Sequence, residues 1–410
     1  MTGSGDTALL PREVEGVARG DARRSLGVAC GAHALHDGYT DLIYVMLPIW
    51  QAEFGLTYAE VGALRGLFSG ALAGFQIPAG LLAERMGPAL VLALGTALAG
   101  LGYCLAGAST GLGVLLIALF VGGLGASTQH PLASALVARV YAGAHSLRAL
   151  GAYNFAGDIG KMTVPVLAAL LIAFMPWRSS LALLGAFGLI AAVAIFMLTP
   201  RFAAEEFSRA EETVSAATTG TSHRSGFFLL LSIGVIDSAT RMGFLTFLPF
   251  VMAAKGASLQ GIGVALALVF AGGAAGKLVC AFIGARIGVI ATVLVTEGMT
   301  AAAILALIPL PLEAGYALLP LIGIALNGTS SVLYGSVPML ISPEKRARAF
   351  SIFYTGTIGS GAIAPVFHGF IGDALGVTAT VIVIALAVLL TLPLALALKP
   401  VLAGSVLSGK

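Results

Sequence analysis

Several ionisable side chains stand inside long apolar segments of this sequence. Asp37 and Asp41 lie near the middle of one such segment, and Asp158 and Lys161 lie in another. A charge inside a lipid bilayer is costly unless it is paired or faces water, so intramembrane charges usually mark a path for ions or substrates. These residues are therefore the first candidates for function. The remaining charges in apolar segments are Arg65, Asp237, Arg241, Lys277 and Glu297.

Asp37 is the side chain best suited to exchange a proton. Burial favours the neutral form of a carboxyl group, and an approaching cation restores the charged form. His33 lies one turn away and His130 lies in a later segment, and both imidazoles could relay protons near neutral pH. We therefore predict a proton-coupling group of Asp37, His33 and His130. The alternatives are a carboxylate permanently paired with Arg65 or Arg241, and a packing role for His130.

Four cations in the apolar segments favour an anionic substrate. Arg65 and Lys161 lie in the first half of the chain, and Arg241 and Lys277 lie in the second. Arginine presents a planar fork that matches carboxylate, phosphonate or phosphate groups. We therefore expect a small anionic or zwitterionic substrate. The predicted substrate-binding residues are Tyr39, Asp41, Arg65, Tyr153, Asn154, Asp158, Lys161, Asp237, Arg241, Lys277, Asn327 and Tyr354.

The same cations have a simpler explanation. Asp158 and Lys161 are spaced i,i+3 and Asp237 and Arg241 are spaced i,i+4, so each pair could neutralise itself on one helix face. The cations would then only balance the carboxylates, and their number would say nothing about the substrate.

A metal site is a further alternative. His33, His36, Asp37 and His130 offer donor atoms that divalent metals accept. Their spacing is not diagnostic of a metal centre. We therefore predict no bound metal and no cofactor, and transport of a divalent metal stays an alternative.

The composition places these charges in a membrane protein. Hydrophobic residues make up 58% of the 410 residues and charged residues 10%, far from the balance of soluble domains. A spanning helix needs about 20 apolar residues, so the chain has room for about a dozen spans. We predict an all-α membrane protein with twelve transmembrane helices. The predicted spans are residues 26–50, 59–83, 88–108, 112–136, 149–175, 178–199, 226–253, 258–284, 289–309, 316–340, 350–371 and 377–398.

A long polar stretch divides the spans into two groups of six. We predict a cytoplasmic N-terminal tail at 1–25, six-helix bundles at 26–199 and 226–398, a cytoplasmic linker at 200–225 and a cytoplasmic tail at 399–410. The N-terminal residues lack the apolar core of a secretory signal. Most Lys and Arg outside the spans fall on one side, which puts both termini in the cytoplasm. The expected location is the inner (plasma) membrane.

The two halves of the sequence match each other. Asp37 and Asp41 fall against Asp237 and Arg241 when the halves are aligned. Parallel repeats related by an axis along the membrane normal form a substrate site at their interface, near the middle of the membrane. Further matched pairs are Pro48 with Pro249, Gln76 with Lys277, Arg85 with Arg286, Gly87 with Gly288, and Pro165 with Pro365.

The loop after the second predicted span carries a family motif. Gly80-Leu81-Leu82-Ala83-Glu84-Arg85-Met86-Gly87 resembles the major facilitator signature Gly-x-x-x-Asp-Arg-x-Gly, with Glu84 in place of Asp. The resemblance implies the major facilitator fold of two pseudo-symmetric six-helix bundles, with a cytoplasmic gate at this loop. The second half has Ala285 where the acid would be. The predicted gate residues are Gly80, Glu84, Arg85, Gly87 and Arg286.

The first half is also similar to the fosmidomycin-resistance group of drug exporters. The similarity rests on Ala32-His33-Ala34-Leu35-His36-Asp37, on Leu47-Pro48-Ile49 and Glu53-Phe54-Gly55-Leu56-Thr57, and on Gly125-Ala126-Ser127-Thr128-Gln129-His130-Pro131. The sequence departs from the group at Leu132, Asp158 and Lys161. The resemblance implies export driven by inward proton flow.

These observations predict a secondary transporter that works by alternating access. Its expected activity is proton-coupled export of a small anionic or zwitterionic drug or metabolite, with protons and the lipid bilayer as partners, no nucleic acid, and a monomeric state. An uptake carrier for a carboxylate nutrient is one alternative, and a non-transporting receptor or assembly factor is another. An enzyme is not expected, because no nucleophile and base form a recognisable motif.

Overall fold

The computed structural model describes residues 19–141, 143–200, 223–342 and 345–407. Most of the predicted N-terminal tail, nearly all of the predicted linker and the last three residues of the C-terminal tail lie outside these ranges. Throughout the described ranges the chain forms helices and no strands. A bilayer explains this choice, because lipid offers the backbone no hydrogen-bond partner and a helix satisfies its own polar groups.

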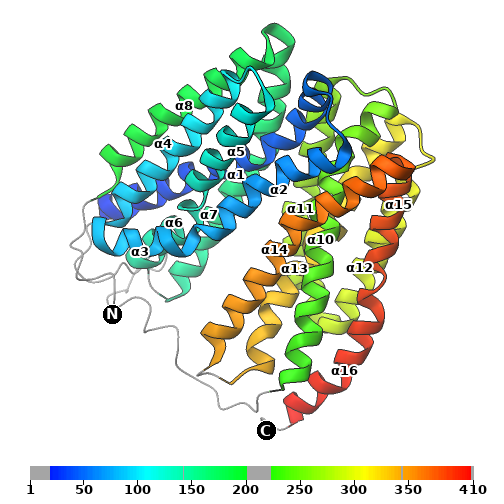
Figure 1. Cartoon of the computed structure of the whole chain (residues 1–410). Coiled ribbons are helices and arrows are strands. Elements are labelled where there is room, and N and C mark those ends of the chain that lie inside the picture. The colour runs from blue at the N-terminus through cyan, green and yellow to red at the C-terminus, as the bar shows by residue number, and fades with distance from the viewer. Residues whose placement is uncertain (1–18, 142, 201–222, 343–344, 408–410) are drawn as a thin grey trace, which may run out of the picture.

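The described helices fall into two groups, one in each half of the chain. The first group is α1 (Arg19–Phe54), α2 (Tyr58–Gly74), α3 (Gln76–Met86), α4 (Pro88–Gly107), α5 (Leu112–Ala126), α6 (Gln129–Val140), α7 (Gly143–Phe174) and α8 (Trp177–Leu198). The second group is α10 (Arg224–Ala254), α11 (Leu259–Ile287), α12 (Val289–Leu307), α13 (Leu312–Leu340), α14 (Arg346–Leu375), α15 (Val377–Val388) and α16 (Thr391–Leu407). Figure 1 shows the two groups side by side.

The number of membrane crossings follows from helix length and composition. Within the described residues, ten helices are long and apolar enough to cross a membrane, and α2 with α3, bent by 41°, makes an eleventh if the pair is one span. α1 is not among them, because His36, Asp37 and Asp41 make its central part polar. Its 36 residues still exceed the about 20 that a span requires. α1 therefore supplies the twelfth predicted crossing.

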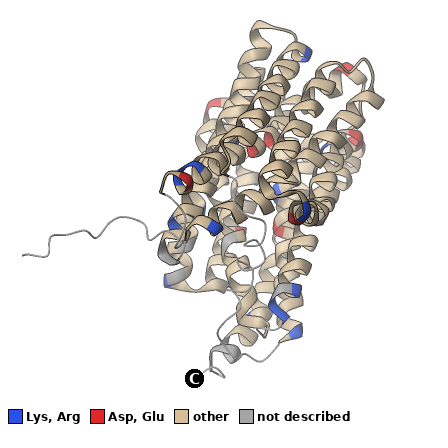
Figure 2. Ribbon diagram, turned by 90° about the vertical axis from the view of Figure 1, so that its left-hand side faces the viewer, with Lys and Arg blue, Asp and Glu red and all other residues tan. Residues whose placement is uncertain are grey.

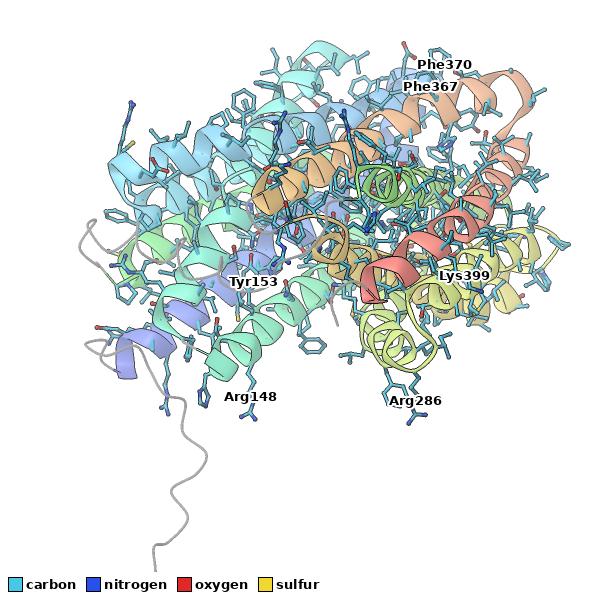
Figure 3. The ribbon with its side chains drawn as sticks, turned by 90° about the horizontal axis from the view of Figure 1, so that it is seen from below. Arg148, Tyr153, Arg286, Phe367, Phe370 and Lys399 are labelled. Atoms are coloured by element: carbon cyan, nitrogen blue, oxygen red, sulfur yellow. The ribbon has the colours of Figure 1, made fainter. Side chains whose placement is uncertain are left out.

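The outer surface of the helices is apolar. Ile77, Phe174 and Leu278 are 75%, 85% and 77% exposed, and Figure 3 shows Phe367 and Phe370 pointing outward from α14. Figure 2 shows few charged residues along the helices. So large an exposed apolar surface fits contact with lipid rather than with water. The chain is a multi-pass membrane protein.

The internal repeat appears as matching turns. Gly87 precedes α4 with φ of 85°, and Gly288 precedes α12 with φ of 84°. Both values lie in the left-handed region that glycine adopts without strain. Thr57 caps the start of α2 with its side chain, and Ser258 caps the start of α11 in the same way. The two halves therefore share local structure as well as sequence.

Two helix pairs make most of the contact between the halves, α2 with α14 and α7 with α11, and α1 also contacts α10. Small residues allow a close approach, since a Cβ added to Gly62 would lie 2.3 Å from the carbonyl oxygen of Pro365. Asp373 of α14 also accepts hydrogen bonds from the backbone N–H groups of Tyr58 and Ala59, at 2.6 and 3.1 Å. These contacts lie away from the chain termini, and the halves diverge toward the termini in Figure 1.

Candidate functional site

Asp37 lies at the centre of a cluster that α1, α6 and α7 form. Its side chain is buried. Oδ2 lies 3.1 Å from His33 Nε2 and 3.3 Å from Lys161 Nζ, and Oδ1 lies 3.6 Å from His130 Nε2. The structure thus brings together the three residues of the predicted proton-coupling group. It adds Lys161 as the cation beside Asp37, where the sequence suggested an arginine as one alternative.

The imidazole of His33 is held from its other side. Nδ1 lies 2.8 Å from the carbonyl oxygen of Tyr153, and the two rings stack with centroids 4.1 Å apart. A carbonyl oxygen only accepts hydrogen bonds, so Nδ1 carries a proton and donates it. A hydrogen bond between Nε2 and Asp37 then needs a second proton, either on His33 or on the carboxyl group. The pair therefore offers a place for one exchangeable proton.

Asp37 opens onto a cavity of about 200 Å³ between the two halves. Asp41 and Lys161 also line this cavity, as does Arg241 from the other half. Residues from both repeats therefore meet in one space, as a repeat-interface site requires. The lining residues are Asp37, Thr40, Asp41, Arg65, Ser69, Leu72, Gln76, His130, Lys161, Ser238, Arg241, Met242, Tyr334, Thr357, Ile358 and Gly361.

Arg65 and Arg241 bring positive charge to the cavity from opposite halves. Arg65 donates from Nη1 to Ser69 Oγ at 2.5 Å, and its guanidinium lies 4.8 Å from the centre of the Tyr44 ring. Within the described part of the chain, Nε of Arg65 and Nε of Arg241 are buried without a hydrogen-bond partner. Buried donors are usually satisfied. Each arginine therefore keeps an unused donor beside the cavity.

Asp158 and Lys277 form a bridge between the halves. Lys277 Nζ of α11 lies 2.6 Å from Oδ1 and 2.8 Å from Oδ2 of Asp158 on α7. The local pair of Asp158 with Lys161 considered from the sequence is therefore wrong, because Lys161 turns to Asp37 instead. Asp158 and Lys277, both predicted to bind substrate, do not line the central cavity.

Asp237 lies beside the central cavity and not in its wall. It lines a small pocket together with Ser238, Arg241, Tyr334 and Thr357, and these four residues also line the central cavity. Glu297 of α12 lies next to Asp237, with the two carboxyl groups within hydrogen-bonding reach of each other. The second half therefore has an acidic pair next to the site.

Other predicted wall residues lie elsewhere. Tyr39 is buried in the first half and donates its hydroxyl hydrogen to the carbonyl oxygen of Leu184. Tyr153 supports His33, and Asn154 is exposed. Asn327 donates to the Gly323 carbonyl oxygen of its own helix, and Tyr354 stacks on Tyr334. None of these five predicted residues lines the central cavity.

Ser69, Gln76 and Tyr334 are among the cavity residues that the sequence did not assign to the site. Ser69 follows Arg65 by one helical turn, and that spacing is a signal that could have identified it. Gln76 matches Lys277 in the repeat and could have been found in the same way. Tyr334 carries no such signal, because its position depends on how α13 packs.

The predicted cytoplasmic gate residues lie at helix ends. Glu84 and Arg85 are exposed at the end of α3, and Gly87 supplies the turn into α4. Arg286 stacks on Phe282 of its own helix at 4.2 Å from the ring centre, and Figure 3 shows it projecting from the molecule. Among the described residues, no ion pair joins the two copies of the motif. Their role as a gate stays a prediction.

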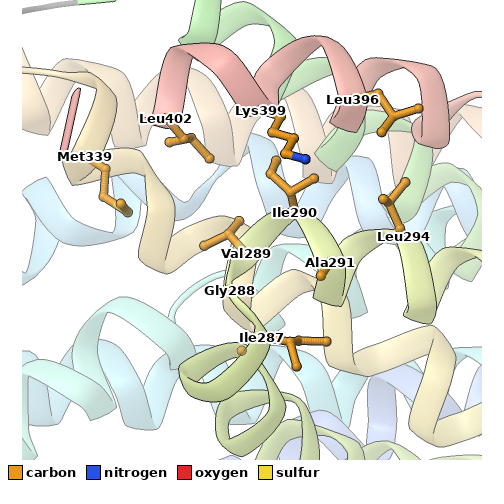
Figure 4. Close-up of a pocket in the computed structure, with 11 residues that line it drawn as sticks. Ile287, Gly288, Val289, Ile290, Ala291, Leu294, Met339, Leu396, Lys399 and Leu402 are labelled. Atoms are coloured by element: carbon orange, nitrogen blue, oxygen red, sulfur yellow. The ribbon is translucent and has the colours of Figure 1, made fainter. Parts of the chain in front are cut away.

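A larger cavity, of about 520 Å³, lies apart from the charged cluster (Figure 4). It sits within the second half, where the start of α12 meets α13 and α16, and Lys399 is the one charged residue in its described lining. Its other walls are aliphatic. This cavity has the volume for a ligand but lacks the converging polar groups that fix one, so we place the site at the smaller central cavity.

The metal alternative can be tested against the geometry of the cluster. Ligand atoms of His33, Asp37 and His130 lie within 4.8 Å of one another. Lys161, however, already places an ammonium group 3.3 Å from Asp37. A divalent ion would be repelled by this charge, which favours protons over metal at the carboxylate.

Several curated transporters are similar to this chain in sequence. The chain is 25% identical over 348 residues to the "Probable L-galactonate transporter" of Escherichia coli, covering 78% of this chain and 76% of that protein. It is 25% identical to a "Probable sulfoacetate transporter" of Cupriavidus necator, covering 86% and 87%. The fosmidomycin resistance protein of Escherichia coli is 29% identical over 168 residues, 40% of this chain and 41% of that protein.

The fold is also that of known transporters. A bacterial homologue of the human lysosomal transporter Spinster, in an inward-facing and occupied conformation, matches with a TM-score of 0.76 at 16% identity, covering 96% of this chain and 99% of that one. At this identity the likeness shows the fold alone. The family model of the Major Facilitator Superfamily matches residues 29–236 and 230–405. The chain therefore belongs to the Major Facilitator Superfamily and is a secondary transporter rather than an enzyme.

Proposed function

We propose that the protein couples the transport of a small organic anion to protons through Asp37. The observation that carries this proposal is the contact between Lys161 and Asp37, 3.3 Å apart, in the wall of a cavity that Arg65 and Arg241 also line. Two carboxylates, one lysine and two arginines from both halves thus share a space in which a substrate could meet them.

The Asp37–Lys161 pair links proton binding to anion binding. While Asp37 is ionised, it neutralises the lysine. When Asp37 takes up a proton, the Lys161 ammonium loses its partner and becomes free to attract an anion. Each ligand therefore raises the affinity for the other, as a coupling free energy between two sites requires. His33 and His130 contact Asp37 and provide a route by which the proton arrives or leaves.

Two features support an anion as cargo. Buried guanidinium nitrogens of Arg65 and Arg241 lack partners among the described residues, and a carboxylate, sulfonate or phosphonate would satisfy them. The relatives that match most of the chain are named for galactonate and sulfoacetate, which are organic anions. Galactonate, sulfoacetate and fosmidomycin are therefore the first compounds to test.

The direction of transport is a separate question. The similarity to the fosmidomycin-resistance group supports export, as the sequence predicts. The Asp37–Lys161 contact favours uptake instead. If the proton and the anion bind together, they cross the membrane together, and an inward proton flow would carry the anion inward. Vesicle flux with proton gradients of both signs separates exchange from joint movement.

The central test replaces Asp37 with Asn in purified protein that is reconstituted into vesicles. A thermal-shift screen of carboxylates, sulfonates and phosphonates first selects the ligand, because a ligand stabilises the state that it binds. We expect Asp37→Asn to keep the ligand-induced shift but to lose the response of flux to an imposed proton gradient. Asp21→Asn, in the first turn of the same helix, is the matched control. Proton-driven flux that survives Asp37→Asn would exclude Asp37 from coupling.

A further inference from the structure

Two acidic side chains lie in contact inside the second half. Asp237 of α10 is 4% exposed and Glu297 of α12 is 1% exposed. Their carboxyl groups lie within hydrogen-bonding reach of each other. An ionised carboxylate has acceptors but no donor, so such a bond requires a proton on one of the two groups. Two ionised carboxylates buried next to each other would repel each other strongly.

The surroundings of the pair do not provide enough positive charge to keep both acids ionised. In the described part of the chain, Arg241 of α10 is the cation that faces the pair. The other polar neighbours are neutral: Thr329, Ser330 and Tyr334 of α13, and Thr357 of α14. Oε1 of Glu297 has no hydrogen-bond partner among the described residues. One cation facing two carboxyl groups leaves one negative charge for a proton to neutralise.

The pair lies next to the central cavity. Asp237 lines the small pocket whose walls include Ser238, Arg241, Tyr334 and Thr357, and these residues continue into the wall of the central cavity. Asp237 also stands at the position that matches Asp37 in the sequence repeat. The pair is therefore next to the proposed transport site and at the equivalent place in the other half.

We propose that Asp237 and Glu297 form a second proton-binding site, a buried carboxyl pair that shares one proton at neutral pH and reaches the central cavity through Asp237. With one proton, the pair carries one negative charge, which balances Arg241. An anion that binds to Arg241 neutralises its positive charge. The negative charge of the pair then lacks its counter-charge, and the pair takes up a second proton. This role in transport rests on the proposed function, whereas the shared proton itself does not.

Infrared spectroscopy of the protein in lipid detects the proton directly. The carbonyl stretch of a protonated carboxyl group is separate from the bands of a carboxylate, and it shifts when the sample is moved to deuterium oxide. We expect the wild-type protein to show such a band at neutral pH. Labelling the glutamate side-chain carboxyl with carbon-13 should shift part of this band without any mutation. A wild-type spectrum with no protonated carboxyl band at neutral pH overturns the proposal.

Variants assign the band to the pair. Glu297→Gln and Asp237→Asn should each remove the intensity of one carboxyl group, because either change leaves a single acid beside Arg241, which then ionises. Glu313→Gln, at an exposed position in the first turn of α13, is the matched control and should leave the band unchanged. A band that Glu297→Gln and Asp237→Asn both leave intact belongs to other groups and overturns the proposal.

Asp37→Asn separates this inference from the proposed function. If Asp37→Asn keeps proton-driven flux while Glu297→Gln removes the band, the shared proton stands and the coupling role of Asp37 fails. If Asp37→Asn uncouples flux while the wild-type protein lacks the band, the carboxyl pair fails and the coupling role of Asp37 stands.

Discussion

Asp37 and Asp237 occupy matching positions in the two halves, yet their surroundings differ. Asp37 has Lys161, His33 and His130 within 3.6 Å. Asp237 has a second acid, Glu297, as its neighbour, with Arg241 as the facing cation. The repeat therefore keeps an acid at this position but changes the residues around it. One half surrounds the acid with groups that donate or carry protons, and the other half places a competing acid there.

The free-energy cost of burying a charge explains why both arrangements are stable. An isolated carboxylate in a bilayer interior is expensive, and it persists when a cation pairs with it or a proton neutralises it. In the first half, Lys161 is the cation that pairs with the acid. In the second half, a proton shared by Asp237 and Glu297 neutralises one of the two acids. The two acids should accordingly respond differently when their partners are removed.

The largest effect is expected from Lys161→Met. The change removes the ammonium beside Asp37 and one of the cations that line the cavity, while the apolar stem of the side chain is kept. A hydrogen bond to a charged group contributes about 1.5–3 kcal/mol, so the loss of this contact and of its attraction for the anion should lower proton-driven flux by about 100-fold. Vesicle flux of the selected anion measures it.

Lys161→Arg is the control for this change, because it keeps the charge with a different shape. It should retain more flux than Lys161→Met at every proton gradient. Equal flux in the wild type and in Lys161→Met would mean that the first half needs no cation beside its acid, and the contrast between the halves would fail.

Arg241→Gln tests the second half and should have a smaller effect. The central cavity keeps Arg65 and Lys161, so an anion loses one of three cationic partners, and its affinity should fall by about tenfold, or 1.4 kcal/mol. The dependence of flux on Asp37 should remain. Ligand titration by thermal shift measures the affinity, with Lys255→Gln, whose Nζ donates to backbone carbonyl oxygens of the loop before α13, as a control away from the cavity.

The grouping of His33, Asp37 and His130 could be predicted, because the depth of a residue in the membrane follows from its position along the span. His33 and Asp37 share one face of α1 through their i,i+4 spacing, and the motif around His130 pointed to the same group. The fold was predicted from the apolar segments, the repeat and the Gly80–Gly87 motif, and the structural comparisons confirm it. α1 crosses despite its polar centre, which span counting by apolarity alone misses.

The partners of the charges could not be predicted, because they depend on packing between helices. Lys161 could turn to Asp158 on its own helix or to Asp37 on α1, and spacing favours the former. Lys277 resolves the choice by binding Asp158 from the other half. The same limit applies to Glu297, whose neighbour Asp237 lies on a helix 60 residues away in sequence.

The Asp158–Lys277 bridge should be worth less than the cavity charges. Lys277 has a side chain that is 40% exposed, against 9% for Asp158, so solvent screens part of the attraction. We expect a coupling energy of about 1 kcal/mol between Asp158→Asn and Lys277→Gln in a double-mutant cycle. Thermal unfolding of both single variants and of the double variant measures it, provided that the helices stay folded. Strictly additive effects would show that the bridge does not join the halves energetically.

Tyr39→Phe should have the smallest effect on transport. The sequence predicted Tyr39 as a wall residue, but the structure buries it in the first half, where its hydroxyl donates to the carbonyl oxygen of Leu184. Removing the hydroxyl leaves that carbonyl without its donor and should cost about 1 kcal/mol of stability, with no change in the concentration of anion that gives half-maximal flux. Tyr334→Phe is the matched comparison, because Tyr334 lines the central cavity. If Tyr39→Phe weakens anion binding as much as Tyr334→Phe does, the wall of the site extends into the first half beyond the cavity described here.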